Sequence, residues 1–224
     1  MKKILVAFLM LAIFSAGCKS WTKTQKGAVI GTVGGAAAGA VIGRVAGNTA
    51  LGAIIGATVG GVTGAIIGNK MDKQAEEMKK NLPDAQVERV GEGIVIEFNN
   101  KILFGFDQSN LSTTSRTNLD KLIAILNKYP DTNIEVQGHT DSKGTTRYNQ
   151  ALSDRRASSV YTYLSGNGTS SSRLTMKGFG ETAPKYDNAT QDGQTQNRRV
   201  EFLVSANEKM KAEAAKEAAK TDPK

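Results

Sequence analysis

The stretch from residue 134 to residue 157 constrains the fold most, because its periodicity changes within a few residues. Ile134 and Val136 alternate with polar residues, which predicts a half-buried strand, until Gly138 breaks the pattern. A Ser-Lys-Gly turn follows, and a helix is expected from about Thr146. The sequence therefore predicts a fold in which strands and helices interleave.

Polar side chains gather where this strand gives way to the helix: His139, Thr140, Asp141, Asn149 and Arg156. Asn149 and Arg156 are seven residues apart, so they lie on one face of the helix. The start of the helix adds backbone N–H donors and a partial positive charge. An Asp and an Arg that face one such cradle can hold a zwitterion, Asp141 taking an ammonium group and Arg156 a carboxylate. From residue types alone, an internal salt bridge between the two is an equally good interpretation.

Motifs in a fixed order along the chain carry a family resemblance. They are Gly-His-Thr-Asp at 138–141, Leu-Ser-Asp-Arg-Arg-Ala at 152–157, Gly-Phe-Gly-Glu at 178–181 and Asn-Arg-Arg-Val-Glu-Phe at 197–202. Together they resemble the OmpA-like peptidoglycan-binding domain, whose family includes the peptidoglycan-associated lipoprotein and the flagellar stator protein MotB. The resemblance covers about residues 94–205. It implies non-covalent binding of the diaminopimelate residue of the peptidoglycan stem peptide, gripped by Asp141 and Arg156.

Four further residues are candidates for the same site. Thr140 and Asn149 are placed to take remaining ligand oxygens, and by resemblance Arg198 closes the site. Asp107 ends a segment, residues 102–107, that resembles the family's first motif, and it is expected either at the rim of the cradle or as a cap that closes a turn.

Catalysis is not expected. His139 is the single histidine of the chain, and no Ser or Cys nucleophile accompanies it in a recognised pattern. We expect it to pack under the turn. One His and one Cys also argue against a zinc centre, so neither a metal nor another cofactor is predicted. A wall hydrolase or transpeptidase would need a nucleophile or a metal site.

The N-terminus has the pattern of a lipoprotein signal. Residues 1–17 combine two lysines with an apolar run too short to span a bilayer. Small residues then lead to Cys18, the only cysteine, which resembles the lipidated cysteine of a bacterial lipobox. Residues 18–26 are a polar linker, and Lys19-Ser20 after the cysteine favours the outer membrane by the same resemblance.

Residues 27–69 carry glycine at every fourth position. The glycines are residues 27, 31, 35, 39, 43 and 47, then 52, 56, 60, 64 and 68. Residues four apart share a helix face, and in membranes such small-residue grooves let two helices approach closely. The segment resembles a glycine-zipper module, and we predict a membrane-inserted helical hairpin. A zipper that oligomerises in the periplasm and a flexible tether are the alternatives.

The remaining segments complete the predicted domain. Residues 70–84 are charged and are interpreted as a solvated connector. Residues 85–206 form the OmpA-like domain, which opens with a hairpin over 86–98 whose Ile94, Ile96 and Phe98 share a face. Residues 183–196 are expected to be a long loop. Residues 207–224 lack an apolar face and are expected to be a charged tail, either a frayed helix or disordered.

The predicted fold class is α+β. The expected order is βαβαββ, with two helices packed on one face of a mixed sheet and the glycine-zipper hairpin ahead of it. The chain has a formal net charge of +8. Outside the N-terminus its charged residues are of both signs, so nucleic-acid binding is not expected.

The predicted function is that of an outer-membrane lipoprotein that anchors the envelope to peptidoglycan, with its C-terminal domain in the periplasm. The alternative is an envelope assembly protein, in which the glycine zipper forms an oligomer or pore and the domain is only an anchor. A defined oligomeric mass in detergent would favour that alternative.

Overall fold

The computed structural model describes Val59, residues 61–105 and residues 108–221. The strands are β1 (Gln86–Val90), β2 (Gly93–Asn99), β3 (Thr132–His139), β4 (Leu174–Gly180) and β5 (Arg199–Ala206). The helices are α5 (Gly61–Asn81), α6 (Asn100–Leu103), α7 (Thr113–Lys128), α8 (Thr146–Gly166), the 3-10 turn η2 (Ser171–Arg173), α9 (Gln191–Asn197) and α10 (Glu208–Thr221).

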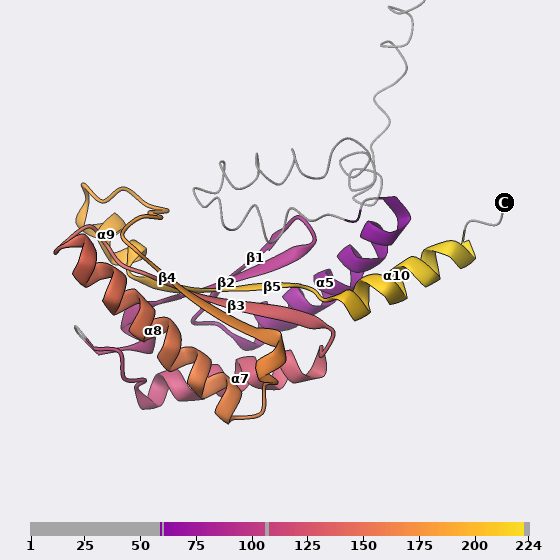
Figure 1. Ribbon diagram of the computed structural model, residues 1–224, viewed down its shortest axis with the longest axis horizontal. Helices are drawn as coiled ribbons and strands as arrows, with labels where there is room; N and C mark the ends of the chain where they lie inside the picture. Colours follow the sequence, from indigo (N-terminus) through magenta and orange to yellow (C-terminus); the bar gives the residue numbers. More distant parts are fainter. Residues whose placement is uncertain (1–58, 60, 106–107, 222–224) are drawn as a thin grey trace, which may run out of the picture.

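The five strands form one mixed sheet in the order β1-β2-β5-β3-β4. β3 and β4 are parallel and joined through α8, whereas the other neighbours are antiparallel. The last strand, β5, lies in the centre, and α7 and α8 cover one face (Figure 1). The run from β2 to β5 has the predicted βαβαββ order, with β1 as the extra hairpin strand. The predicted fold class is confirmed.

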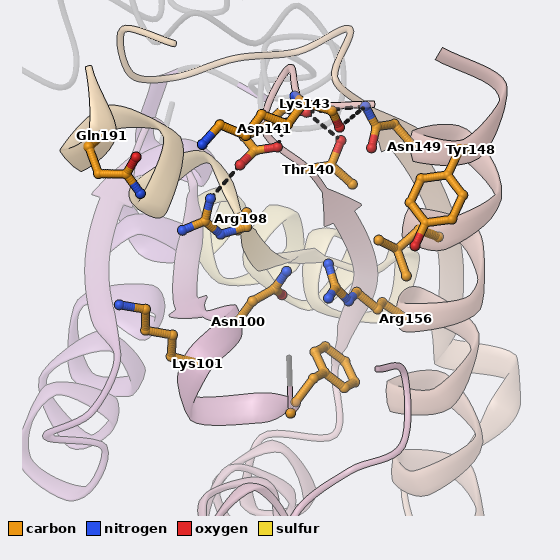
Figure 2. A pocket seen from close by; sticks show the side chains of 13 residues that line it. Asn100, Lys101, Thr140, Asp141, Lys143, Tyr148, Asn149, Arg156, Gln191 and Arg198 are labelled. Atoms are coloured by element: carbon orange, nitrogen blue, oxygen red, sulfur yellow. Dashed lines mark hydrogen bonds and ion pairs between the residues drawn. The ribbon is translucent and has the colours of Figure 1, made fainter. Parts of the chain in front are cut away.

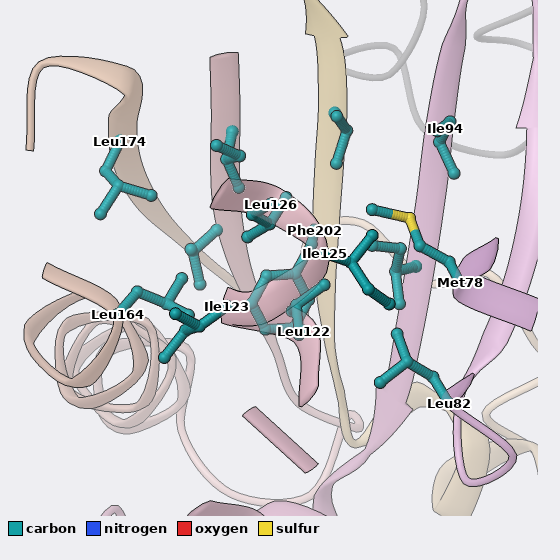
Figure 3. Packing of buried hydrophobic residues seen from close by; sticks show 14 of the residues in the cluster. Met78, Leu82, Ile94, Leu122, Ile123, Ile125, Leu126, Leu164, Leu174 and Phe202 are labelled. Atoms are coloured by element: carbon teal, nitrogen blue, oxygen red, sulfur yellow. The ribbon is translucent and has the colours of Figure 1, made fainter. Parts of the chain in front are cut away.

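Alternate residues of the central strands build the core. Ile94, Ile96 and Phe98 of β2 share the helix-covered face, as predicted, and are fully buried. Phe98 meets Phe202 of β5 edge to face, with ring centroids 5.8 Å apart. Such pairs add about 0.5–1.5 kcal/mol beyond the burial of their area. Figure 3 shows Phe202 and Ile94 among the buried side chains of the core.

The helix α7 follows its sequence signals closely. The Ser112 hydroxyl caps it by accepting from the Ser115 amide, and the Ser112 amide donates to the Ser115 hydroxyl. The helix ends at Lys128, two residues before Pro130. Its apolar stripe is buried and includes Leu119, Leu122, Ile123 and Leu126.

The interpretation of residues 70–84 as a solvated connector was wrong. The helix α5 runs from Gly61 across the predicted boundary at residue 69, and its buried residues are Ile67, Met71, Gln74, Ala75 and Met78. These residues recur every three or four positions, so they form one stripe that packs into the core while the lysines and glutamates between them face solvent. Of the predicted glycine-zipper hairpin, residues 27–69, only Val59 and residues 61–69 are described. Within the described part of the chain, we find no helix with the length and apolarity that crossing a bilayer requires.

Two further predictions for the C-terminal part were wrong. The charged tail forms α10, which lies against α5 (Figure 1) and buries Met210 and Ala214. The expected loop over 183–196 contains the start of the short helix α9, capped by the Thr190 side chain, which accepts from the Gly193 amide.

Candidate ligand-binding site

A cavity of about 670 Å³ opens where α6, the β3–α8 turn, α8 and α9 meet (Figure 2). Its lining residues are Asn100, Lys101, Phe104, Gly105, Thr140, Asp141, Lys143, Tyr148, Asn149, Leu152, Arg156, Gln191 and Arg198. The structure thus brings together all the predicted ligand-binding residues that it describes. Asp107, the sixth candidate, lies outside the described residues.

The turn after β3 fixes the carboxylate of Asp141. Its Oδ1 accepts a hydrogen bond from the Lys143 amide at 3.0 Å. The Thr140 hydroxyl donates to the Asp141 carbonyl at 2.9 Å, and the Thr140 amide donates to the Gly180 carbonyl at 2.9 Å. Asp141 is therefore held by backbone contacts on both sides, with its second carboxylate oxygen facing the cavity.

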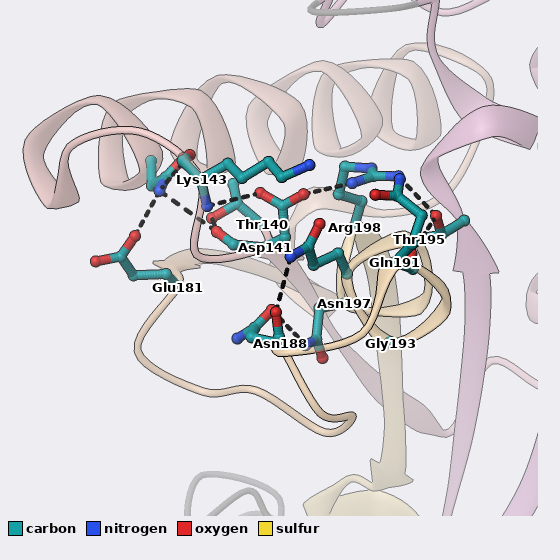
Figure 4. A network of polar contacts seen from close by, with 12 residues as sticks. Thr140, Asp141, Lys143, Glu181, Asn188, Gln191, Gly193, Thr195, Asn197 and Arg198 are labelled. Carbon is teal, nitrogen blue, oxygen red and sulfur yellow. Dashed lines mark hydrogen bonds and ion pairs between the residues drawn. The ribbon is translucent and has the colours of Figure 1, made fainter.

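That second oxygen forms an ion pair with the guanidinium of Arg198. Arg198 also donates to the Thr195 hydroxyl at 2.8 Å, so α9 orients it from behind (Figure 4). The structure gives Asp141 a different partner from the Arg156 of the salt-bridge interpretation.

Asn197 holds the segment from which Arg198 projects. Its Oδ1 accepts from the amides of Lys185 and Tyr186, each at 3.0 Å. Its Nδ2 donates to the Tyr186 carbonyl and to Asn188 Oδ1, each at 2.8 Å. This fully buried amide ties the 183–190 segment to α9, a role that the sequence analysis did not foresee.

Arg156 enters the cavity from the opposite wall (Figure 2). Only 4% of it is exposed, although it carries a charge. Its Nε donates to the Gln108 carbonyl at 3.0 Å, and its guanidinium carbon lies 5.4 Å from the centre of the Phe104 ring. The carbonyl and the aromatic face compensate part of the cost of burial and fix the plane of the guanidinium.

Asn149 mainly braces the turn. It is 2% exposed, and its Nδ2 donates to the Lys143 carbonyl at 3.1 Å and to a carboxylate oxygen of Glu181 at 2.5 Å. The amide nitrogen thus stabilises the loop that holds Asp141. Contact between Asn149 and a ligand stays a prediction.

His139 packs beneath the turn, as expected. It is fully buried, and its ring stacks on Phe179 with centroids 5.3 Å apart. Burial holds the pKa of His139 well below its usual range, and the nearby charges of Arg199 and Lys185 lower it further.

Sequence reasoning missed several lining residues. Asn100 and Lys101 come directly after β2 and just before the 102–107 segment, and the packing of β2 beside β5 brings them to the cavity. Lys143 lies inside the turn motif and could have been found there. The described lining residues include one carboxylate, that of Asp141, and four positively charged side chains. The positive side chains are those of Lys101, Lys143, Arg156 and Arg198. The described part of the lining therefore carries a surplus of positive charge.

With this geometry established, the chain can be compared with known proteins. The OmpA family model matches residues 103–198, and a model of YMGG-like glycine zippers matches residues 1–72. The chain is similar to the outer-membrane lipoprotein YfiB of Pseudomonas aeruginosa, with 36% identity over 115 residues, 51% of this chain and 68% of that protein. It is also similar to the peptidoglycan-associated lipoprotein of Buchnera aphidicola, with 30% identity over 131 residues, 58% of this chain and 72% of that protein.

A solved structure described as the cell wall anchor of the T6SS from Pseudomonas aeruginosa has the same fold. The identity is 27% and the TM-score 0.54, over 61% of this chain and 97% of that one. The chain belongs to the OmpA family. Other curated relatives are much longer, and the chain spans 32% of the outer membrane porin F of Pseudomonas fluorescens.

The relatives also bear on the location of the protein. Outer-membrane and peptidoglycan-associated lipoproteins among them support the predicted location, the outer membrane with the OmpA-like domain in the periplasm. Cys18 and most of the predicted glycine-zipper hairpin fall outside the described residues, so the lipidation site, the hairpin and any oligomer formed through it stay predictions.

Proposed function

We propose that this protein anchors the outer membrane to the cell wall by binding the diaminopimelate residue of the peptidoglycan stem peptide, without chemical reaction. The observation that carries the proposal is that Asp141 and Arg156 line one cavity, each held in place by other neighbours. The names of its relatives, a peptidoglycan-associated lipoprotein and a cell wall anchor, support the wall as the partner.

Arg156 is the proposed carboxylate-binding group. Its guanidinium is planar and already oriented by Gln108 and Phe104, so little side-chain entropy is lost when it accepts a two-pronged contact. Because the residue is almost fully buried, the ion pair with the ligand forms in a medium of low dielectric constant and is stronger than it would be in water.

Asp141 is the proposed ammonium-binding group. One of its oxygens is held by the turn and the other by Arg198. The ligand's ammonium group would share the second oxygen with Arg198, whose guanidinium would then be placed to take a ligand oxygen. In this proposal Thr140 and Asn149 act chiefly through the turn, and Asp107 completes the rim.

The surplus of positive charge fits the same ligand. A stem peptide carries several carboxylates and few ammonium groups, and Lys101 and Lys143 line the cavity on either side of Asp141 and Arg198. Exposed lysines of this kind raise the rate of encounter more than the final affinity.

The test is co-sedimentation of the full chain, purified in mild detergent, with insoluble diaminopimelate-type peptidoglycan. Removing both gripping side chains in an Asp141→Ala/Arg156→Ala variant should lower retention at least tenfold, since each charged hydrogen bond contributes about 1.5–3 kcal/mol. An Arg155→Ala variant is the matched control, because Arg155 precedes Arg156 on α8 and is exposed.

Circular dichroism and thermal unfolding must show that the double variant is folded, since Arg156 also supports the segment around Gln108. Equal retention of wild type and folded double variant would show that the cavity is not the wall-binding site. Absence of retention in the wild type would reject wall binding itself.

A further inference from the structure

Asn100 is a buried polar residue whose side-chain amide has no hydrogen-bond partner among the described residues. It opens α6 directly after β2, and its backbone amide donates to the Arg198 carbonyl at 2.9 Å. The residue is 5% exposed, and within the described part of the chain neither its Oδ1 nor its Nδ2 has a hydrogen-bond partner. The side chain points into the cavity, close to Arg156 (Figure 2).

Unlike Asn100, the other buried asparagines among the described residues have hydrogen-bond partners for their side chains. Asn118 donates to Asp84, and Asn149 and Asn197 hold the two loops beside the cavity. Buried amides are nearly always paired in this way, because an unpaired donor or acceptor is costly. An unpaired carboxamide kept in the wall of a binding cavity is best explained by a ligand that pairs with it.

The chemistry of the carboxamide selects the kind of group that it pairs with. It offers a donor and an acceptor on one edge, which complements the C=O of one backbone amide and the N–H of the next, because the two groups of a single trans amide point in opposite directions. A carboxylate would use only the donor, and an ammonium group only the acceptor. Apolar surface from Phe104 and Leu152 lines the same cavity and suits the methylene groups beside such an amide.

We propose that Asn100 is a ligand-binding residue that pairs with the peptide backbone of the bound stem peptide, with Nδ2 donating to the carbonyl of one amide and Oδ1 accepting from the N–H of the neighbouring amide. The inference rests on the proposed function and extends it, since the cavity then reads the backbone of the peptide as well as the zwitterion that ends the diaminopimelate side chain. Peptide-linked diaminopimelate is thereby preferred over the free amino acid.

The experiment compares two ligands by isothermal titration of the full chain in detergent. One is the tripeptide L-alanyl-γ-D-glutamyl-meso-diaminopimelate, and the other is free meso-diaminopimelate, which has the zwitterion but no amide. Asn100→Leu should weaken tripeptide binding about tenfold and leave binding of the free amino acid unchanged. Asp141→Ala should weaken both.

The thermal stability of the Asn100 variants distinguishes a ligand-binding role of Asn100 from a structural one. Because Asn100→Leu replaces an unpaired amide by an apolar group of similar size, its melting temperature should be equal to or above that of the wild type. Asn100→Ala repeats the test with a smaller side chain, and Asn133→Ala, at an exposed position of β3, is the control that should change neither affinity.

The outcomes are distinct. If Asp141→Ala abolishes binding of both ligands while both Asn100 variants bind the tripeptide like the wild type, the role of Asn100 is overturned and the proposed function stands. Equal weakening of both ligands by the Asn100 variants would also overturn the amide contact. If the wild type binds neither ligand, the proposed function fails, and the inference fails with it.

Discussion

At the scale of single residues, Arg198 and Arg199 show how one peptide bond can separate two environments. Arg198 lies just before β5, is partly exposed, and pairs with Asp141 in the cavity. Arg199 is fully buried, pairs with Glu201 at 2.7 Å and lies 3.9 Å from Glu97. The pleat of the strand turns successive side chains to opposite sides, so one arginine faces the ligand and the other closes a buried charge cluster.

His139 borders this buried cluster and is predicted to make stability depend on pH. Its Nε2 lies 4.0 Å from Glu201, and its pKa in the folded chain is well below its usual value, first because of burial and then because of Arg199 and Lys185. Below a pH of about 6.5 the unfolded chain takes up a proton that the folded chain does not. Stability should therefore fall as the pH is lowered, by about 1 kcal/mol between pH 6.5 and 5.5.

Urea unfolding at the two pH values checks this prediction. His139 is the single histidine of the chain, so His139→Phe should remove the pH dependence in this range while keeping a ring against Phe179. The same loss of stability in the variant would assign the effect to carboxylates instead.

At the scale of elements, the contact between α8 and the β3–β4 pair sets the shape of the cavity. Gly138 and Gly178 are partners on these strands, and a Cβ at Gly138 would meet the Ser153 carbonyl oxygen at 2.3 Å. The same helix is held by the Ser153 hydroxyl, which accepts from the Gly180 amide at 2.9 Å. Glycine is needed here because the helix backbone approaches the strand too closely for a side chain.

Gly138→Ala should therefore push α8 outward. We expect a loss of about 1–3 kcal/mol in the free energy of unfolding, together with weaker peptidoglycan retention, because Arg156 moves with the helix. Denaturant unfolding and co-sedimentation measure the two effects. Gly166→Ala is the control at the end of α8, where an added Cβ meets nothing within 4 Å, and it should change neither quantity appreciably.

At the scale of the whole molecule, the folded unit is larger than the OmpA family match over residues 103–198. The helices α5 and α10 lie outside that match, yet Met71, Met78 and Met210 are buried. The segment that follows the glycine-rich stretch is thus part of the domain core, so the domain is joined to that stretch by packed helix.

Met78→Ala tests this integration. Met78 is fully buried in the main core, so its truncation should cost about 2–5 kcal/mol of unfolding free energy, within a single cooperative transition. Met176→Ala, at a position that is 48% exposed, is the matched control and should cost little. If both variants lost the same small amount of unfolding free energy, α5 would be a connector and not part of the core.

The sequence by itself determined the local pattern. Alternating residues predicted β2 and β3, and the motifs around Asp141 and Arg156 predicted that both would line one site. These features depend on neighbours within a few residues, so local periodicity and turn chemistry carry them.

Only the tertiary structure decided what is joined across long separations. It placed Arg198 on Asp141, brought Asn100 to the cavity, and packed the charged segments of α5 and α10 as parts of the core. Each of these follows from the insertion of β5 beside β2 and β3 and from the burial of a few widely spaced apolar residues. No local pattern encodes them, because the free energy that selects them comes from surfaces that meet only when the chain has folded.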